Sequence, residues 1–232
     1  MRKFIPLCLT VALLVSAGVL MPTSHAQIPG LVSSAISRME KNKRSLKSLR
    51  ANITMSKYNS QLRDSDSYSG VVAYIPGAGG SSSAFMRLEW QHPKQEILAV
   101  ANGSYTLYQP RLGQAYHGKT GSVRGKDSDV LSLINMSPAQ LRTKFGEFQD
   151  TREETLWGGV WTQHFKAIPN GPANYKYIEV WIDKDGMPVQ TKMVEKNDDS
   201  TTVRLTNVER NPSIPTDQFK IDLPANVKII KG

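Results

Sequence analysis

The side chains that most often catalyse reactions or bind metals are few in this sequence, and they lie far apart. Beyond residue 26 the histidines are His92, His117 and His164, and none has a cysteine, another histidine or a carboxylate nearby at metal-ligand spacing. Isolated histidines on strands and loops more often serve structure than chemistry. The sequence therefore predicts no metal site and no catalytic histidine with a partner.

Neither the acidic pairs nor the nucleophile motifs of the sequence indicate a catalytic site or a metal site. Glu153 and Glu154 are adjacent, and adjacent residues of a strand face opposite sides of a sheet, so they cannot easily form a catalytic dyad. The run Asp183-Lys184-Asp185-Gly186 resembles the start of a calcium loop but lacks the distal glutamate, and a hairpin turn explains it. No Gly-x-Ser-x-Gly elbow occurs. These residues therefore indicate no catalytic dyad, no calcium site and no nucleophile motif, and we expect no cofactor.

Short runs of alternating residues dominate the chain and predict strands. Residues 85–118 contain four such runs, and the turn Asn102-Gly103 between two of them is a strong hairpin signal, because a type I′ turn needs a positive φ at both positions. In the first run Met86, Leu88 and Trp90 share one face, since the side-chain period of a strand is two. One face of the predicted sheet is therefore apolar and needs a cover.

Two helical segments are available for that cover. Residues 31–49 have an amphipathic pattern that predicts one long helix, and residues 127–145 predict two short helices, the second capped by Ser137-Pro138. The short helices either fill the core or form a movable lid. We expect a single α+β, mainly β, domain of about eleven antiparallel strands over residues 27–232. The candidate lid residues are Leu131, Leu133, Ile134, Met136 and Leu141.

The first 26 residues have the pattern of a secretory signal peptide. Arg2 and Lys3 precede an apolar run, and Ser24-His25-Ala26 supplies small residues at the −3 and −1 positions of a cleavage site. We expect cleavage after Ala26 and export to the periplasm. Cys8, the single cysteine of the chain, lies in this segment, so the mature protein has no disulfide.

The chain is basic. Its formal net charge is +9, and removal of Arg2 and Lys3 with the signal peptide leaves +7. Such an excess is compatible with plain solubility, with an anionic membrane surface or with an acidic partner. No ribonucleoprotein-type aromatic motif accompanies it, so we do not expect nucleic acid as a partner.

The predicted strands offer a large apolar face. Two interpretations remain open from the pattern alone: these side chains pack a solid core, or part of the face stays unfilled and holds an apolar guest. Each buried CH₂ group of a guest contributes roughly 0.8 kcal/mol, so an acyl chain needs no catalytic group to bind. The residues that would line such a cavity are Met86, Leu88, Trp90, Leu98, Val100, Trp161, Phe165, Ile178, Val180, Ile182, Met187, Val189, Met193, Val203 and Leu205.

The sequence resembles the LolA-like family, the periplasmic carriers of outer-membrane lipoproteins. The resemblance covers nearly all of the mature chain and rests on structural motifs that are shared with relatives of other cargo. The matching residues are Arg87-Leu88-Glu89-Trp90 with Pro93, the run Ala101 to Pro110 with Gln114, the run Ile178 to Pro188, Leu205-Thr206-Asn207-Val208, and Phe219.

This resemblance implies an unclosed antiparallel β-barrel whose concave apolar face is covered by the N-terminal helix and a helical lid. It implies a cavity for the acyl chains of lipoproteins, no enzyme activity, and a monomer that takes cargo from an inner-membrane release complex and passes it to an outer-membrane acceptor. In the family an arginine on an early strand latches the lid, and Arg87 and Arg63 are both candidates here.

Three alternatives remain beside the lipoprotein carrier. One is a carrier of phospholipid, glycolipid or another hydrophobe with the same fold. Another is a sensor domain for envelope stress, which would bind lipoprotein as a signal. The third, from a different class, is an exported enzyme with an unrecognised site.

Overall fold

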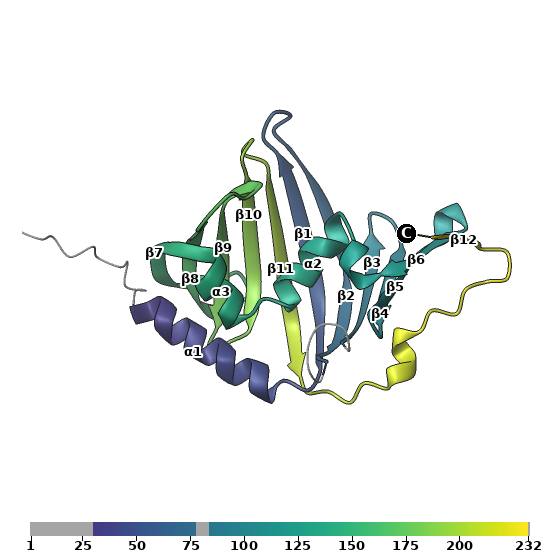
Figure 1. The fold of residues 1–232 in the computed structure, drawn as a ribbon, viewed down its shortest axis with the longest axis horizontal. Coiled ribbons are helices and arrows are strands. Elements are labelled where there is room, and N and C mark those ends of the chain that lie inside the picture. The colour runs from purple at the N-terminus through teal and green to yellow at the C-terminus, as the bar shows by residue number, and fades with distance from the viewer. Residues whose placement is uncertain (1–29, 78–83, 232) are drawn as a thin grey trace, which may run out of the picture.

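The computed structural model describes residues 30–77 and 84–231, so the predicted signal peptide lies outside the described residues. In the described part twelve strands form one sheet in the order β12-β6-β5-β4-β3-β2-β1-β11-β10-β9-β8-β7 (Figure 1). All neighbouring pairs are antiparallel except β12 and β6, which are parallel. The end strands β12 and β7 do not pair, so the predicted unclosed sheet is confirmed, with twelve strands in place of about eleven.

The bounds of the elements follow the alternating and helical patterns of the sequence. The strands are β1 Leu49–Asn59, β2 Asp64–Ile75, β3 Phe85–His92, β4 Glu96–Ala101, β5 Ser104–Gln109, β6 Gln114–Lys119, β7 Phe145–Leu156, β8 Val160–Pro169, β9 Tyr175–Asp183, β10 Pro188–Glu195, β11 Ser200–Arg210 and β12 Lys228–Lys231. The helices are α1 Gly30–Ser45, α2 Lys126–Ile134 and α3 Pro138–Lys144, with the short 3₁₀ turns η2 Pro110–Leu112, η3 Thr120–Ser122 and η4 Thr216–Phe219.

The predicted turn and cap are present. Asn102 and Gly103 have φ values of 51° and 76°, as a two-residue type I′ hairpin between β4 and β5 requires. Ser137 caps α3: its hydroxyl accepts from the backbone N–H of Gln140, whose side chain in turn accepts from the backbone N–H of Ser137.

The order of the strands explains why α2 and α3 cover the sheet. The chain moves outward from β1, in the middle, to β6 near one edge, and it resumes at β7 on the opposite edge before returning to β11 beside β1. The connection between β6 and β7 must therefore span the width of the sheet. Figure 1 shows α2 and α3 crossing the sheet on this path. We call the face that they cover the inner face and the opposite side the outer face.

The buried apolar side chains of the inner face form two clusters. The first joins β1 to β4 and part of β10 and β11 to α2, and Trp90, Leu88 and Ile53 are fully buried in it. The second joins β8 and β9 to α1 and α3, and it contains Ile36 and Val180. Each cluster therefore has its own helical cover.

Helix α1 is held close to the sheet by the turn between β9 and β10. Gly186 has a φ of +86°, and a Cβ atom there would lie 2.2 Å from the backbone oxygen of Arg38. Only glycine allows both the positive φ and this close approach. The turn therefore fixes the position of α1 over β8 and β9.

The C-terminal segment runs along the outer face. It leaves β11, passes through η4 and adds β12 beside β6. Phe219 of η4 is buried, and its ring lies 5.6 Å from the ring of Phe85, centroid to centroid. Because Phe85 alternates with the inward-facing Met86 along β3, this contact lies on the outer face.

Candidate functional site

A cavity of about 630 Å³ lies between the two apolar clusters, under the α2–α3 crossing. Its roof is formed by Leu131 of α2, Met136 of the link between α2 and α3, and Leu141 of α3. Its floor includes Ile178 of β9 and Met193 of β10. The full lining is Gly103, Thr120, Gly121, Asp129, Leu131, Ser132, Leu133, Asn135, Met136, Gln140, Leu141, Lys144, Phe145, Tyr175, Ile178, Thr191, Met193, Thr201 and Val203.

The residues expected to line a cavity divide into three groups. Ile178, Met193 and Val203 do line it. A larger group lies in the packed clusters, where neighbouring side chains fill the space above them. That group consists of Met86, Leu88, Trp90, Leu98, Val100, Val189 and Leu205 in the first cluster, and Phe165, Val180 and Ile182 in the second. Met187 also belongs to the first cluster, but it lines a second, smaller pocket. Trp161 is half-buried on β8, with the guanidinium carbon of Arg38 5.5 Å from its ring.

The expected lid residues lie almost all at the cavity. Leu131, Leu133, Met136 and Leu141 line it. Ile134 instead lines a second pocket of about 290 Å³, together with residues of α1 and with Met187, which lies between β9 and β10. The two pockets share Asn135 and Met136, so the short link between α2 and α3 separates them.

The sequence interpretation missed the polar part of the lining. Thr191 and Thr201 lie beside Met193 on the cavity floor, and Tyr175 and Lys144 lie at the end near β7. The register could have revealed the threonines: Thr201 pairs with Met193, and Thr191 pairs with Val203. Burial raises the pKa of Tyr175, so this hydroxyl stays neutral in the physiological range.

The start of α2 is anchored to the sheet by a buried hydrogen bond. The indole N–H of Trp90 donates to Asp127 over 2.7 Å, and Asp127 is only 3% exposed. Burial raises the pKa of Asp127, although the Trp90 hydrogen bond and the charge of Lys126 act in the opposite direction. No pattern in the sequence indicated this contact, since a carboxylate in the first turn of a helix usually serves only the helix dipole.

Further polar contacts surround this anchor. Lys126 forms an ion pair with Glu96, and its ammonium lies 5.8 Å from the ring centroid of Tyr68. Asp129 pairs with Lys57 of β1 over 3.0 Å. These contacts hold the first two turns of α2 over β1, β3 and β4.

The two arginines that were candidate latches lie away from the lid helices. Arg87 points to the outer face, where it forms an ion pair with Glu89 and donates from Nη1 to the backbone oxygens of Gln218 and Lys220, over 3.0 and 2.8 Å. Arg63 is exposed in the turn between β1 and β2. Arg87 therefore ties the C-terminal segment to the sheet, because side chains at odd positions of β3 face away from α2 and α3.

The histidines form no cluster with each other in the described residues. His164 is buried, with Nε2 2.9 Å from Glu179 and Nδ1 3.1 Å from the backbone oxygen of Asp150. The hydrogen bond from His164 lowers the pKa of Glu179. His92 and His117 are exposed and contact Ser69 and Thr106. Within residues 30–77 and 84–231, no group of three or more His, Cys, Asp or Glu side chains is arranged to bind a metal.

Within residues 30–77 and 84–231, no helix is both long enough and apolar enough to cross a bilayer.

Known proteins resemble this chain in sequence and in fold. A carrier from Bordetella avium (strain 197N), described as an outer-membrane lipoprotein carrier protein, is 24% identical over 161 residues, which cover 66% of this chain and 72% of that protein. Among solved structures, an uncharacterised conserved protein from Thermus thermophilus has a TM-score of 0.53 at 13% identity, with 87% of this chain and 99% of that chain covered. MucB has a TM-score of 0.52 at 12% identity, with 85% of this chain and 64% of that chain covered. At these identities the two structures establish a shared fold alone.

The family match is more extensive. Residues 85–222 match the family described as outer membrane lipoprotein carrier protein LolA. The matched region runs from β3 to the segment after η4, so it contains every residue that lines the cavity. Because this match spans more than half of the chain, the protein belongs to the LolA family, whose members are carrier proteins.

Proposed function

We propose that this protein is a periplasmic carrier that shields the acyl chains of lipoproteins in the cavity between α2–α3 and the sheet. The observation that carries the proposal is the cavity itself: about 630 Å³, roofed by leucines and a methionine of the lid and floored by apolar residues of β9 to β11. That volume lies within the range of roughly 300–1,000 Å³ typical of ligand pockets.

The lining suits a flexible apolar chain. Met136 in the roof and Met193 in the floor have unbranched side chains that adapt to guests of different shape. Each CH₂ group buried there contributes roughly 0.8 kcal/mol, so a single acyl chain can supply the binding energy of a carrier. No proton transfer or nucleophile is needed, which agrees with a carrier and not an enzyme.

The predicted signal peptide and the family support a route through the periplasm. In this route the protein accepts acylated cargo from a release complex in the inner membrane and delivers it to an acceptor in the outer membrane. It travels as a monomer, with the acyl chains covered by α2 and α3.

A photocrosslink in the living periplasm tests this function. A photoreactive residue in place of Leu131, in the roof, should yield an adduct with a lipoprotein, identified by its mass. The same residue in place of Leu62, which is 76% exposed at the far end of the sheet, is the control for chance encounters. Adducts of Leu131 with free phospholipid or glycolipid would retain the cavity but change the cargo. A folded Leu131 variant without any lipid adduct would contradict the proposal.

A further inference from the structure

Exposed cations gather on one side of α1. Lys41, Lys43 and Arg44 are exposed in its second half, and Glu40 is the one acidic residue of the helix. Residues three and four apart on a helix are neighbours, so Lys43 and Arg44 lie on the same side as Glu40. This side of α1 faces toward α3, because Glu40 forms an ion pair with Arg142 over 2.6 Å.

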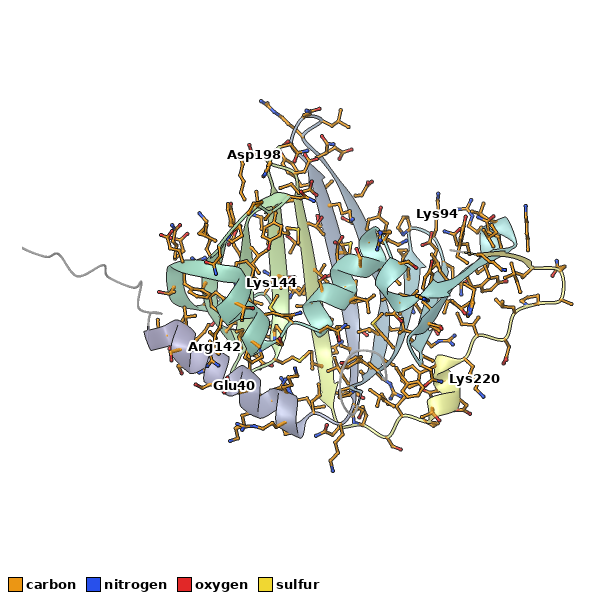
Figure 2. The ribbon with its side chains drawn as sticks, in the orientation of Figure 1. Glu40, Lys94, Arg142, Lys144, Asp198 and Lys220 are labelled. Atoms are coloured by element: carbon orange, nitrogen blue, oxygen red, sulfur yellow. The ribbon has the colours of Figure 1, made fainter. Side chains whose placement is uncertain are left out.

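Helix α3 continues this positive surface. Arg142 and Lys144 are both exposed, and α3 contains no acidic residue. The Glu40–Arg142 pair joins the exposed sides of the two helices, and Figure 2 shows Glu40, Arg142 and Lys144 on the same side of the molecule, far from Lys94 and Lys220. We define the α1–α3 basic face as Lys43, Arg44, Arg142 and Lys144, with the single internal carboxylate of Glu40.

The α1–α3 basic face borders both the main cavity and the second pocket. Lys144 lines the main cavity, and Lys43 lines the second pocket. Neither lysine has a carboxylate within ion-pair distance among the described residues. By contrast Asp129, the acidic residue of the cavity lining, is paired with Lys57. The uncompensated charge at the edges of the two pockets is therefore positive.

We propose that the α1–α3 basic face docks the protein on the surface of an anionic phospholipid bilayer. This inference rests on the proposed function, because an acyl chain enters or leaves the cavity at a membrane. Phosphate groups at the bilayer surface supply a negative partner for Lys43, Arg44 and Lys144, which form no ion pair among the described residues, whereas Arg142 is paired with Glu40. Docking through this face brings the edges of both pockets to the lipid headgroups, and an acyl chain then crosses little water. A bilayer fits better than an acidic protein, since a cation of this face lines each of the two pockets, Lys144 the main cavity and Lys43 the second.

Vesicle binding tests the proposal with the mature chain. Sedimentation with vesicles of phosphatidylglycerol mixed with phosphatidylcholine should pull down the protein, and pure phosphatidylcholine vesicles should not. Binding should weaken as salt is raised. The double variant Lys43→Gln, Arg44→Gln should lose about fivefold in vesicle affinity for each charge removed.

The matched control removes the same charge elsewhere. Lys94 and Lys228 are exposed on the β3–β4 turn and on β12, away from the α1–α3 basic face. The variant Lys94→Gln, Lys228→Gln should keep nearly the affinity of the unchanged protein. An equal loss in both double variants would mean that net charge alone attracts the protein, and it would overturn the proposal.

The orientation on the vesicle can be read with a dye. The mature sequence has no cysteine, so Ser37→Cys on the exposed side of α1 and Gln95→Cys on the β3–β4 turn each accept a single environment-sensitive label. Anionic vesicles should shift the emission of the label at position 37 to the blue and leave the label at position 95 unchanged. The reverse pattern would contradict docking through α1.

The test separates this inference from the carrier function. An acyl-chain probe that is soluble without vesicles measures the cavity alone. If the probe binds but the anionic vesicles do not, the docking proposal fails and the carrier stands. If Lys43→Gln, Arg44→Gln stops delivery in the cell but leaves vesicle binding unchanged, the face meets an acidic protein and the bilayer proposal is wrong. If the probe does not bind the unchanged protein, the proposed function fails first.

Discussion

Asp127 is a carboxylate in a place where charge is costly, and its partner is a neutral indole. Replacing it by alanine removes the acceptor of the Trp90 N–H, which is fully buried. An unsatisfied buried donor costs about 1–3 kcal/mol, so Asp127→Ala should lower the free energy of unfolding by that amount. Urea denaturation of the variant and the unchanged protein measures it. A loss below the error of the measurement would show that water replaces the carboxylate.

Asp127→Asn separates the hydrogen bond from the charge. An asparagine oxygen still accepts from Trp90, but it does not titrate. Burial raises the pKa of Asp127 above 3.8, so between 3.8 and the raised value the folded protein binds more protons than the unfolded chain. The free energy of unfolding of the unchanged protein therefore falls as pH rises through this window, relative to the variant. Urea denaturation of the two proteins over a pH series checks the sign. A free energy of unfolding that rises with pH in the unchanged protein, relative to Asp127→Asn, would refute the assignment.

Side chains of the lid and of the sheet floor enclose the cavity. Substitutions there should affect probe binding more than stability, whereas substitutions in the packed core should affect stability. Leu131→Gln and Met193→Gln change half-buried side chains at the cavity, so each should weaken the binding of an acyl-chain probe about tenfold, at a stability loss of about 1 kcal/mol. Leu88→Glu and Val180→Glu place a charge at fully buried positions and should unfold the protein. Probe titration alongside thermal unfolding measures both effects.

The outcome of these four variants also decides between core and cavity for each position. Stable Leu88→Glu and Val180→Glu proteins that fail only in probe binding would mean that the cavity extends under both clusters. Unchanged probe affinity in Leu131→Gln and Met193→Gln would mean that the guest lies elsewhere. Either result would redraw the site.

The C-terminal segment is the element that Arg87 secures. Two hydrogen bonds from its guanidinium to backbone oxygens are charge-assisted, a class that contributes about 1.5–3 kcal/mol when buried and less here, where the side chain is partly exposed. Arg87→Gln should raise hydrogen exchange in residues 216–222 and leave α2 and α3 unchanged. Faster exchange in α2 and α3, with residues 216–222 unchanged, would instead make Arg87 the lid latch that the family resemblance implies.

Elements were more predictable than the contacts between them. The Asn102-Gly103 hairpin and the cap at Ser137 follow from local chemistry, so the sequence was enough to locate them. Alternation identified the apolar face of the strands, but it could not separate Leu88, which is covered, from Met193, which is not. That distinction depends on where α2 and α3 lie above the sheet. The anchor between Trp90 and Asp127 is a contact 37 residues apart in sequence, which no local pattern encodes.

At the scale of the whole molecule, the cavity is a consequence of the strand order. The chain returns to the middle of the sheet from the far edge, so β11 pairs with β1, as in the register of Ile53 with Leu205, and the chain then runs back to place β12 beside β6. Each cluster has its own cover: α2 for the first cluster, and α1 with α3 for the second. The cavity lies where the two covers meet, and its lining takes side chains from both clusters, including Leu133 and Ile178.

A guest in this cavity should therefore couple the two clusters. Local unfolding of either cluster exposes part of the lining and releases the guest. A bound guest should therefore raise the free energy of local unfolding of both clusters by the same amount, about 2.7 kcal/mol at a probe concentration of 100 times Kd. Native-state hydrogen exchange at slowly exchanging amides, such as those of Leu88 and Val180, measures the two openings separately. The probe should raise the opening free energy at both amides equally, and Met193→Gln should reduce both gains together at a fixed probe concentration. A gain confined to one amide would mean that the guest contacts one cluster alone, and the interpretation of the cavity as the junction of the two clusters would be wrong.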